Sequence, residues 1–342
     1  MIIDKRTSVF KSNDRNALSK ARKDVERTCN GLGFKSLNIY TRDFSWRIFS
    51  YIYNLLQYLL CVIKIPFKSN IYIQYPAPYS KSSYYKYLIK FSKHKKCRII
   101  YIIHDVESLR YNKDDVKNEV SMYNMADVII VHTPAMKEAL THMGVKSQMV
   151  ELTLFDYYIR EGLQLNSERS NDSVAFAGNL DKSTFITELI SKINDQRFLL
   201  YGKQPLKSFA QNRNVQYMGA FPPDEIDVLD AKWGLVWDGD SIDSCTGVLG
   251  NYLRYNSSHK LSLYLAAGLP VIVWDQSAIA DFVSTEQIGV CVSGLKNISD
   301  ILNNISKEKY SVMKSNVRSL QENLLKGAML KSAITKVEAL LS

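Results

Sequence analysis

The residues best suited to binding an anion lie at the start of a predicted helix late in the sequence. From Asn256 onward, polar residues come first, Lys260 falls in the first helical turn, and Gly268 follows the last helical residue. A helix start carries free N–H groups and a partial positive charge, so a lysine there favours a bound anion such as a phosphate group. The alternative is that Asn256 or Ser258 only caps the helix and that Lys260 points to water.

The elements around this lysine alternate short apolar runs with amphipathic stretches. In the first half, the predicted strands are 36–40, 71–75, 98–104, 127–132 and 149–153, and the predicted helices are 15–30, 45–63, 82–94, 113–125 and 134–143. In the second half, the predicted strands are 173–177, 198–201, 215–218, 235–237, 271–274 and 290–292, each with glycine or aspartate at or near its end. This alternation predicts an α/β fold with parallel sheets, helices on both faces, and ligands at the carboxyl ends of the strands.

The chain divides at a polar segment without hydrophobic periodicity, residues 156–172, which we interpret as a linker. A length of 342 residues also favours about two domains. We therefore expect one Rossmann-like, doubly wound domain over 1–155, a second over 173–325, and a C-terminal helix over 326–342. Two such domains facing a cleft would hold a nucleotide on one side and a second substrate on the other.

Composition and motifs indicate the cellular compartment of the protein and disfavour several protein classes. The five cysteines include no Cys-x-x-Cys pair, which disfavours a disulfide scaffold and a cysteine zinc site and favours a reducing compartment. The first six residues contain acid and base where a signal peptide needs an apolar core, so we expect a cytoplasmic protein. The sequence has no glycine-rich Walker motif, which disfavours an ATPase or a kinase.

Positive charge is concentrated in the first third of the chain. The net charge is +10 overall, but residues 1–110 hold 21 basic and 7 acidic residues, a net of +14, whereas residues 111–342 sum to −4. Such a basic amino-terminal region favours an anionic partner, either a membrane surface or nucleic acid. Because no nucleic-acid-binding motif is found, we expect no nucleic acid partner and favour the membrane.

An uncharged run over residues 48–63 offers a second link to a membrane. Its 16 residues fall short of the roughly 20 that a spanning helix needs, so an interfacial helix or a core helix fits better. A second stretch, over 81–96, holds six lysines among Tyr84, Tyr87 and Phe91, a mixture that suits a lipid headgroup surface. The alternatives are a buried domain helix for the first segment and a solvated helix face for the second.

Several motifs together resemble one enzyme family. They are residues 103–110, 177–182, 234–265, 259–273 and 274–282. The chain resembles the bacterial β-1,6-galactofuranosyltransferases of O-antigen and capsule assembly, which belong to the GT-B superfamily of glycosyltransferases. The resemblance begins near Ala17, and the same superfamily includes glucosyltransferases that extend glycans on streptococcal adhesins. One departure is Ser258, which stands where these enzymes usually have proline before His-Lys.

The resemblance implies a UDP-sugar site in the second domain. Asn256, His259 and Lys260 would face the diphosphate, and Lys182, after the Gly178-Asn179 turn, would reach the same anion. Two further sets complete the implied site: Tyr217 beside the uracil, and Ala278 and Ala280 at the opening of a helix whose N–H groups would approach the sugar or the phosphates.

The implied reaction is the transfer of a hexose from a UDP-sugar, with galactofuranose as the first candidate. The acceptor would be a lipid-linked oligosaccharide or a growing glycan of the O-antigen or capsule, and the enzyme would be peripheral on the inner face of the cell membrane. One alternative is a UDP-glucose-dependent enzyme that extends a glycan on a surface adhesin. Another is a non-catalytic partner of a transferase. The sequence leaves open whether the chain forms a homo-oligomer.

Asp238 and Asp240 spell the Asp-x-Asp of metal-dependent glycosyltransferases. Two carboxylates could hold a divalent cation on a diphosphate, and the alternative is hydrogen bonding to backbone or hydroxyl groups. Because Lys260 and Lys182 would already neutralise the diphosphate, we expect no metal and no cofactor.

A β-linked product from a UDP-galactofuranose donor requires inversion, and inversion requires a general base on the acceptor hydroxyl. His104 and Asp105 end the apolar central strand of the first domain, where they would face the cleft. The alternative is that Asp105 caps the next segment and that His104 packs in the core. Three more charged residues are second-tier candidates: Arg15, Glu107 and Arg110.

Overall fold

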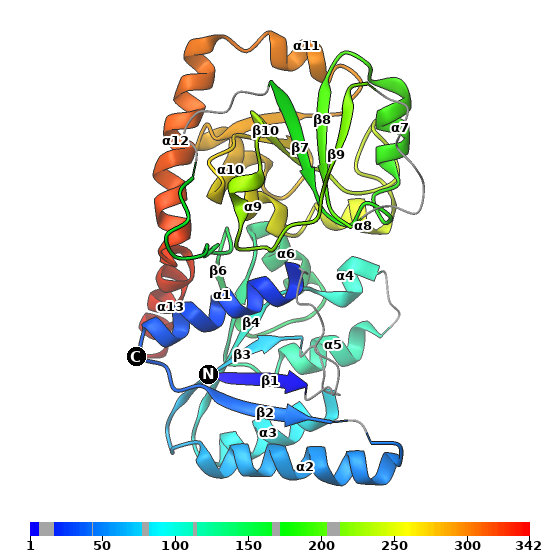
Figure 1. Ribbon diagram of the computed structural model, residues 1–342. Helices are drawn as coiled ribbons and strands as arrows, with labels where there is room; N and C mark the ends of the chain where they lie inside the picture. Colours follow the sequence, from blue (N-terminus) through cyan, green and yellow to red (C-terminus); the bar gives the residue numbers. More distant parts are fainter. Residues whose placement is uncertain (7–16, 43, 77–81, 112–114, 166–171, 204–212) are drawn as a thin grey trace.

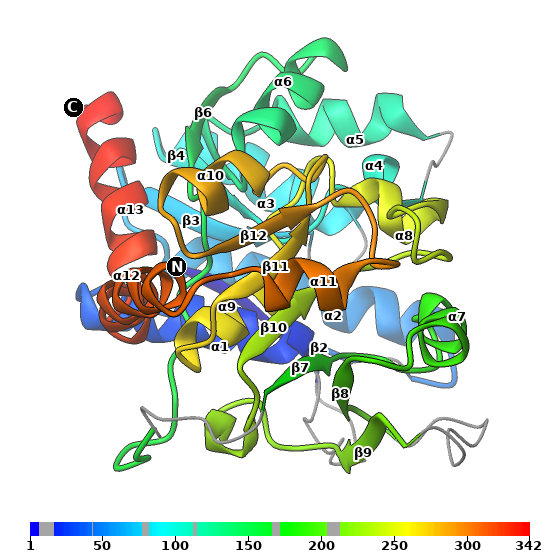
Figure 2. The same ribbon diagram turned by 90° about the horizontal axis from the view of Figure 1, so that it is seen from above.

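The computed structural model describes residues 1–6, 17–42, 44–76, 82–111, 115–165, 172–203 and 213–342. They form two parallel six-stranded sheets, one in each half of an elongated molecule (Figure 1). Helices lie on both faces of each sheet, as the view from above also shows (Figure 2). The α/β architecture with two doubly wound domains, predicted from the alternation of elements, is confirmed.

The first sheet has the strand order β2-β1-β3-β4-β5-β6. Its strands are β1 (Ile2–Arg6), β2 (Leu37–Thr41), β3 (Asn70–Tyr75), β4 (Arg98–Ile103), β5 (Val128–Val131) and β6 (Gln148–Glu151). Its helices are α1 (Ala17–Gly31), α2 (Arg47–Lys64), α3 (Ser82–His94), α4 (Glu107–Tyr111), α5 (Val116–Tyr123) and α6 (Pro134–His142). The sequence did not predict β1, because its acidic and basic residues interrupt the apolar signal that marks a buried strand.

The second sheet has the strand order β12-β11-β10-β7-β8-β9. Its strands are β7 (Ser173–Ala177), β8 (Arg197–Tyr201), β9 (Val215–Gly219), β10 (Trp233–Val236), β11 (Val271–Trp274) and β12 (Gly289–Val292). The helical segments are α7 (Phe185–Lys192), η1 (Ile226–Val228), α8 (Gly247–Tyr252), α9 (His259–Ala266), α10 (Ala280–Thr285) and α11 (Ile298–Asn303).

Each sheet contains one point where the strand order reverses. In the first sheet the chain passes from β1 to β2 on one side and from β3 to β6 on the other, so the reversal lies between β1 and β3. In the second sheet it lies between β7 and β10. Doubly wound sheets bind ligands in the crevice at this point, at the carboxyl ends of the strands. The topology therefore marks two places where functional side chains should gather.

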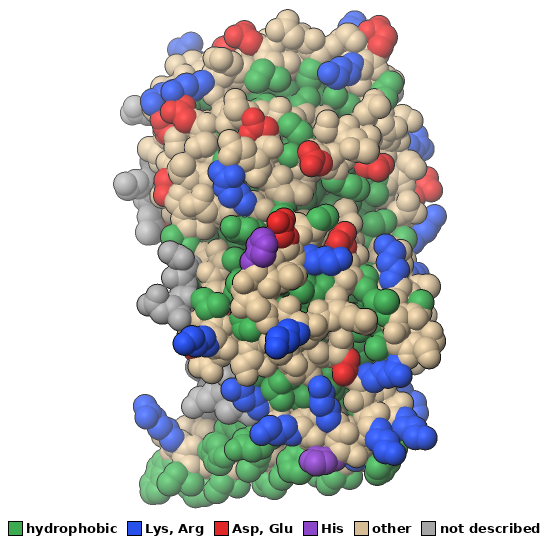
Figure 3. All heavy atoms as spheres, turned by 180° about the vertical axis from the view of Figure 1, so that it is seen from behind, with side chains coloured by type: hydrophobic (Ala, Val, Ile, Leu, Met, Phe, Trp, Pro, Cys, Tyr) green, Lys and Arg blue, Asp and Glu red, His purple; other side chains and the backbone are tan. Residues whose placement is uncertain are grey.

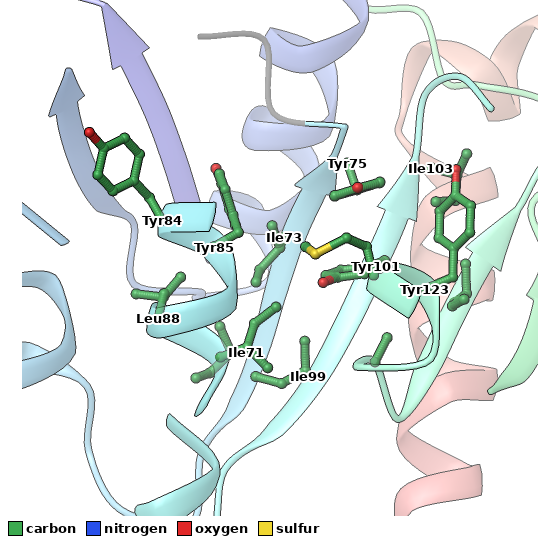
Figure 4. Close-up of a cluster of buried hydrophobic side chains, with 14 of the residues drawn as sticks. Ile71, Ile73, Tyr75, Tyr84, Tyr85, Leu88, Ile99, Tyr101, Ile103 and Tyr123 are labelled. Carbon is green, nitrogen blue, oxygen red and sulfur yellow. The ribbon is translucent and has the colours of Figure 1, made fainter. Parts of the chain in front are cut away.

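The cores are built from the apolar strands and the helices that cover them. In the first half, Tyr75 stacks on Tyr101 at 4.8 Å and meets Tyr123 edge-on at 5.4 Å (Figure 4). All three are buried, as are the isoleucines of β4. Burying one such large side chain contributes about 1.5–3 kcal/mol, so β4 is held rigidly in the sheet and fixes the position of the residues that follow it.

The chain ends in two helices that join the halves. They are α12 (Lys307–Leu325) and α13 (Ala328–Leu341), and α13 returns to the first half, where it packs against α1 and β6 (Figure 1). Leu330 and Val337 are buried there beside Ile100. The sequence predicted a helix at this end but not its packing partner, because amphipathicity identifies an apolar face and not what covers it.

Helix α2 contains the uncharged run over residues 48–63. Only Asn54, Tyr58, Cys61 and Val62 of this helix are buried, so it is a core helix on one face alone. The interpretation of the segment as a buried domain helix is therefore wrong for its other face. Within the described part of the chain, no helix is both long and apolar enough to span a membrane.

Candidate functional site

Lys260 lies at the strand reversal of the second sheet. Its Nζ donates to Asp238 Oδ1 at 2.7 Å and lies 5.2 Å from the ring centre of Phe176. Asp238 follows β10 and Phe176 belongs to β7, so the ammonium group sits between the two strands that flank the reversal. Its side chain is 17% exposed, and the alternative in which Lys260 points to water is therefore wrong. A carboxylate of the chain itself supplies the opposite charge.

Asp240 is bonded differently from Asp238. Its Oδ1 accepts a hydrogen bond from Thr184 Oγ1 at 3.0 Å, which agrees with the hydroxyl alternative for this residue. Asp238 forms an ion pair with Lys260, which is neither the metal ion nor the backbone or hydroxyl hydrogen bond that the sequence suggested. Among the residues whose placement is described, no three His, Cys, Asp or Glu side chains gather as a metal site would require.

The loop before α9 holds buried polar atoms without partners. Asn256 Oδ1, Ser257 Oγ and Ser258 Oγ are all shielded from solvent and make no hydrogen bond. Ser258 is the N-cap residue of α9 but makes no side-chain capping bond, so the interpretation of this serine as a cap is wrong. Each unsatisfied buried group costs about 1–3 kcal/mol, and this cost favours a bound polar ligand beside the helix start.

The turn after β7 lies beside the ends of β8 and β9. Asn179 Oδ1 accepts hydrogen bonds from the backbone N–H groups of Asp181 and Lys182, which shapes the turn and leaves the Lys182 side chain exposed. A Cβ atom on Gly202 would lie 2.2 Å from the Gly178 carbonyl oxygen, so the close approach of the two strand ends requires glycine. Tyr217, 40% exposed, donates to the Gly202 carbonyl at 3.0 Å. The three predicted residues Gly178, Asn179 and Lys182 thus share one sheet edge with Tyr217.

The backbone N–H groups of Ala278 and Ala280 are both occupied within the chain. The Ala278 N–H donates to the Leu253 carbonyl at 2.8 Å, and the Ala280 N–H donates to the Ser277 carbonyl at 3.0 Å. Helix α10 begins only at Ala280. A short loop folds back on itself and satisfies both groups, a detail that small side chains alone do not reveal. That other N–H groups of this helix approach the sugar or the phosphates stays a prediction.

His104 follows β4 and has a defined tautomer. Gln74 donates its amide N–H to the Arg22 carbonyl at 3.2 Å, so its Oε1 must accept, and His104 Nε2 donates to it at 2.6 Å. Nδ1 of His104 then carries a lone pair, and it is buried without a partner. Burial, with a smaller contribution from the Arg22 charge, holds the pKa of His104 well below its usual range. The imidazole is therefore neutral near pH 7.

Asp105 lies next to His104 in an ion pair. Its Oδ2 accepts from Arg110 Nη1 at 2.6 Å, and the side chain remains 21% exposed. Burial raises its pKa, while Arg110 and Arg22 oppose that rise. The N–H groups at the start of α4 donate to the Glu119 carboxylate, so the interpretation of Asp105 as the cap of the next segment is wrong.

Phe155 connects the two halves at the site. Three histidine rings surround it: His104 at 5.5 Å, His132 at 4.9 Å and His259 at 4.4 Å between ring centres. Burial lowers the pKa of His132 to about 4 and that of His259 to about 3. His259 begins α9, whereas His104 and His132 follow strands of the first sheet. The strand ends of the first sheet therefore face the Lys260 region directly.

Arg22 is the charged residue that sequence reasoning missed. Its guanidinium donates to the carbonyl groups of Pro76 at 2.6 Å and Gln74 at 3.5 Å, at the end of β3. This is the strand reversal of the first sheet. The family resemblance begins near Ala17 and therefore includes Arg22, but the sequence of α1 carries no other mark of a site. Arg15, a second-tier candidate, lies outside the described residues.

The comparisons with known proteins agree with this geometry. Residues 7–154 match the family described as glucosyltransferase 3-like, N-terminal domain, and residues 174–337 match glucosyltransferase 3-like, C-terminal domain. The chain is 30% identical to beta-1,6-galactofuranosyltransferase WbbI of Escherichia coli strain K12 over 75% of this chain and 74% of that protein. It is 25% identical to glucosyltransferase 3 of Streptococcus gordonii over 92% of each chain.

A solved glycosyltransferase from Rickettsia africae ESF-5 superposes on the whole chain and on 98% of its own length, with a TM-score of 0.65 at 13% identity. Two doubly wound sheets with facing strand ends define the GT-B fold class, and this protein has that fold. Within that class, the chain belongs to the glucosyltransferase 3-like family.

Proposed function

We propose that this enzyme transfers a hexose from a UDP-sugar to a growing cell-surface glycan with inversion at the anomeric carbon, without a metal ion. The observation that carries the proposal is the arrangement around Phe155. The half-buried Lys260 lies at the strand reversal of the second sheet. On the opposite side of the ring contacts among His259, Phe155 and His104, the Asp105 carboxylate and the neutral His104 imidazole follow a strand of the first sheet. One side suits a diphosphate, and the other suits a hydroxyl that must lose a proton.

The donor half of the reaction rests on positive charge and unpaired polar atoms. A diphosphate bound beside Lys260 would exchange the Asp238 carboxylate for phosphate oxygens and would meet the unpartnered hydroxyls of Ser257 and Ser258. Lys182, exposed on the neighbouring turn, would take part of the same charge. As the bond between the anomeric carbon and the diphosphate breaks, negative charge grows on the leaving UDP, and fixed positive groups stabilise that transition state.

Asp105 is the proposed general base. Its side chain is partly exposed, so an acceptor hydroxyl can approach it, whereas His104 Nδ1 is fully shielded. The pKa of Asp105, raised by burial, makes the carboxylate a better proton acceptor than an ordinary aspartate. The acceptor oxygen would attack the anomeric carbon as Asp105 takes its proton, and UDP would depart from the opposite face.

Galactofuranose is the preferred donor sugar, supported by the identity to the Escherichia coli galactofuranosyltransferase. The Streptococcus gordonii glucosyltransferase, which aligns over more of the chain, supports UDP-glucose as the second candidate. The preferred acceptor is a lipid-linked oligosaccharide of O-antigen or capsule assembly, which would bring the reaction to the inner face of the cell membrane.

The test is a donor screen with a matched site variant. The purified enzyme is offered UDP-galactofuranose, UDP-galactopyranose and UDP-glucose with a lipid-linked acceptor, and both UDP release and the anomeric configuration of the product are measured. We expect turnover with one hexose donor, an inverted product, and loss of UDP release in Lys260→Ala. UDP binding without turnover of any donor would contradict the proposal and favour a non-catalytic partner of another transferase.

A further inference from the structure

The end of the molecule remote from the second sheet carries an uncovered apolar surface. It consists of the outer face of α2 with its flanking residues and part of α3 (Figure 1). The exposed large side chains of this α2 face are Trp46, Ile48, Phe49, Ile52, Leu56, Leu59, Leu60, Ile63 and Phe67, joined by Tyr87 and Phe91 of α3. Exposures reach 70–73% at Trp46, Ile48, Phe67 and Ile63. A contiguous apolar patch of this kind on a soluble fold marks an interaction site.

The α2 face is separate from the surface that folds the helix. Asn54 fixes the inner side, where its amide group pairs with both backbone groups of Arg42, at 2.9 and 3.3 Å. Lys95 fixes the C-terminal end by donating to the carbonyl groups of Val62 at 2.7 Å and Ile65 at 2.8 Å. The buried polar side chain of Asn54 therefore serves the interior, and the apolar side chains on the opposite side of α2 have no role in the described core.

Positive charge surrounds the α2 face. Residues 44–104 contain ten lysines and arginines and no aspartate or glutamate. Among those on α2, α3 and the segment after α2, the exposed or half-buried ones are Arg47, Lys64, Lys68, Lys86, Lys90 and Lys93. The space-filling view shows hydrophobic side chains gathered at this end of the molecule with Lys and Arg beside them (Figure 3).

We propose that the α2 face docks onto an anionic lipid bilayer, with α2 lying in the plane of the interface. An amphipathic helix with a wide apolar face, basic flanks and no acidic residue binds in this way. The exposed aromatic rings of Trp46 and Tyr87 suit the headgroup level, and the long lysine side chains can reach the phosphates while their stems lie on apolar surface.

Charge decides between a bilayer and a second copy of the chain. In a two-fold dimer through the α2 face, each basic rim would meet the same rim of the partner, and like charges would oppose one another. Anionic lipid would neutralise both rims. The α2 face also lies at the end of the molecule away from the second half, so docking there leaves the facing strand ends uncovered (Figure 1).

The fluorescence of one tryptophan can report binding of the α2 face to vesicles. Of its four tryptophans, Trp233, Trp237 and Trp274 are buried in the second half, whereas Trp46 is 71% exposed on the α2 face. Adding vesicles of phosphatidylcholine with phosphatidylglycerol should move the tryptophan emission to shorter wavelength, and vesicles of phosphatidylcholine alone should not. Raising the salt from about 0.1 M to about 1 M shortens the screening length from about 10 Å to about 3 Å and should release the protein.

Two matched variants assign the binding to the α2 face. Ile52 is 48% exposed on α2 and Val312 is 46% exposed on α12, so an aspartate at either site should leave the fold intact and changes the net charge equally. In vesicle flotation without donor or acceptor, Ile52→Asp should lower retention on anionic vesicles at least tenfold, and Val312→Asp should match the wild type. The result is independent of the proposed reaction, because no sugar transfer is measured.

Three outcomes would overturn the proposal. The wild type could fail to float with anionic vesicles at low salt, or Val312→Asp could lose as much binding as Ile52→Asp. In the third, sedimentation would show a wild-type dimer that Ile52→Asp converts to monomer, with no vesicle binding by either, and a second copy would then be the occupant of the α2 face.

Discussion

At the scale of single residues, the ion pair between Lys260 and Asp238 determines how the donor site should respond to mutation. Lys260→Ala removes the cation and leaves Asp238 to repel a diphosphate, so UDP affinity should fall by about 1.5–3 kcal/mol. The measurement is calorimetric titration with UDP. Asp238→Asn, which frees the lysine, should not weaken UDP binding.

The control for this pair is Lys296→Ala. Lys296 pairs with Asp243 at the same 2.7 Å, but its side chain is 56% exposed and lies outside the strand reversal. UDP affinity unchanged in this variant and reduced in Lys260→Ala would assign the effect to the site. Equal losses in both would indicate a long-range charge effect instead.

Asp105→Asn tests the general base. The amide keeps the size of the side chain but cannot accept the acceptor proton, so transfer should fall by about 10²–10⁴ while UDP affinity stays the same. The rate of sugar transfer and the UDP affinity are both measured on the same variant. Glu138→Gln, at an exposed position of α6 in the same half of the molecule, is the control and should keep the wild-type rate. Transfer by Asp105→Asn at the wild-type rate would shift the base to His104, to Glu107 or to the amino-terminal loop around Asp14, which lies outside the described residues.

We also predict that sugar transfer requires no metal ion. Lys260 and Lys182 would neutralise the leaving diphosphate, so transfer should continue in EDTA. Asp240 is engaged by the Thr184 hydroxyl and Asp238 by Lys260. Activity that is lost in EDTA and restored by Mg²⁺ or Mn²⁺ would show that the two aspartates exchange these partners for an ion.

At the scale of elements, the sequence predicted strands well where both faces are buried. The predicted strands 173–177 and 271–274 match β7 and β11 to the residue, because every position in them is apolar or small and buried. Strand β1, which lies between β2 and β3, was missed because the charged residues Asp4, Lys5 and Arg6 interrupt its apolar pattern. Lys260 was placed at the right helix start, but its partner lies 22 residues away, and only the folded sheet brings them together.

The junction between α12 and α13 depends on one buried carboxylate. Asp156 accepts hydrogen bonds from the N–H groups of Met329 and Leu330, both at 2.9 Å, and so caps α13. Burial raises its pKa from 3.8 to about 6. A raised folded-state pKa stabilises the protein below the unfolded value and loses that stability as pH rises through the folded value. The charged form thus carries a cost at neutral pH.

Asp156→Asn should remove that cost, so the stability of the variant relative to the wild type should depend on pH. The amide has no charge, so the stability of the variant relative to the wild type should increase between about pH 4 and about pH 6, by up to about 3 kcal/mol. Denaturant unfolding at several pH values measures it. A constant difference across that range would show that Asp156 does not titrate there.

At the scale of the whole molecule, α13 is one of the elements that tie the two halves together. It follows α12 of the second half but packs its buried face, including Leu330 and Val337, into the core of the first. Three of the four tryptophans are buried in the second half, so their fluorescence reports that half, whereas far-ultraviolet circular dichroism reports both. In the wild type, both signals should change at the same denaturant concentration.

Val337→Asp should separate the two signals. Val337 is fully buried, and an unpaired charge there costs about 3–5 kcal/mol, all of it in the contact between α13 and the first half. The second half keeps its own clusters around Tyr264 and Trp233, so its tryptophans should still unfold late while part of the circular dichroism signal is lost early. Leu340→Asp, on the same helix but 50% exposed, is the control and should behave as the wild type. If both signals move together in Val337→Asp, the halves unfold as one cooperative unit, and the tie between them is broader than α13.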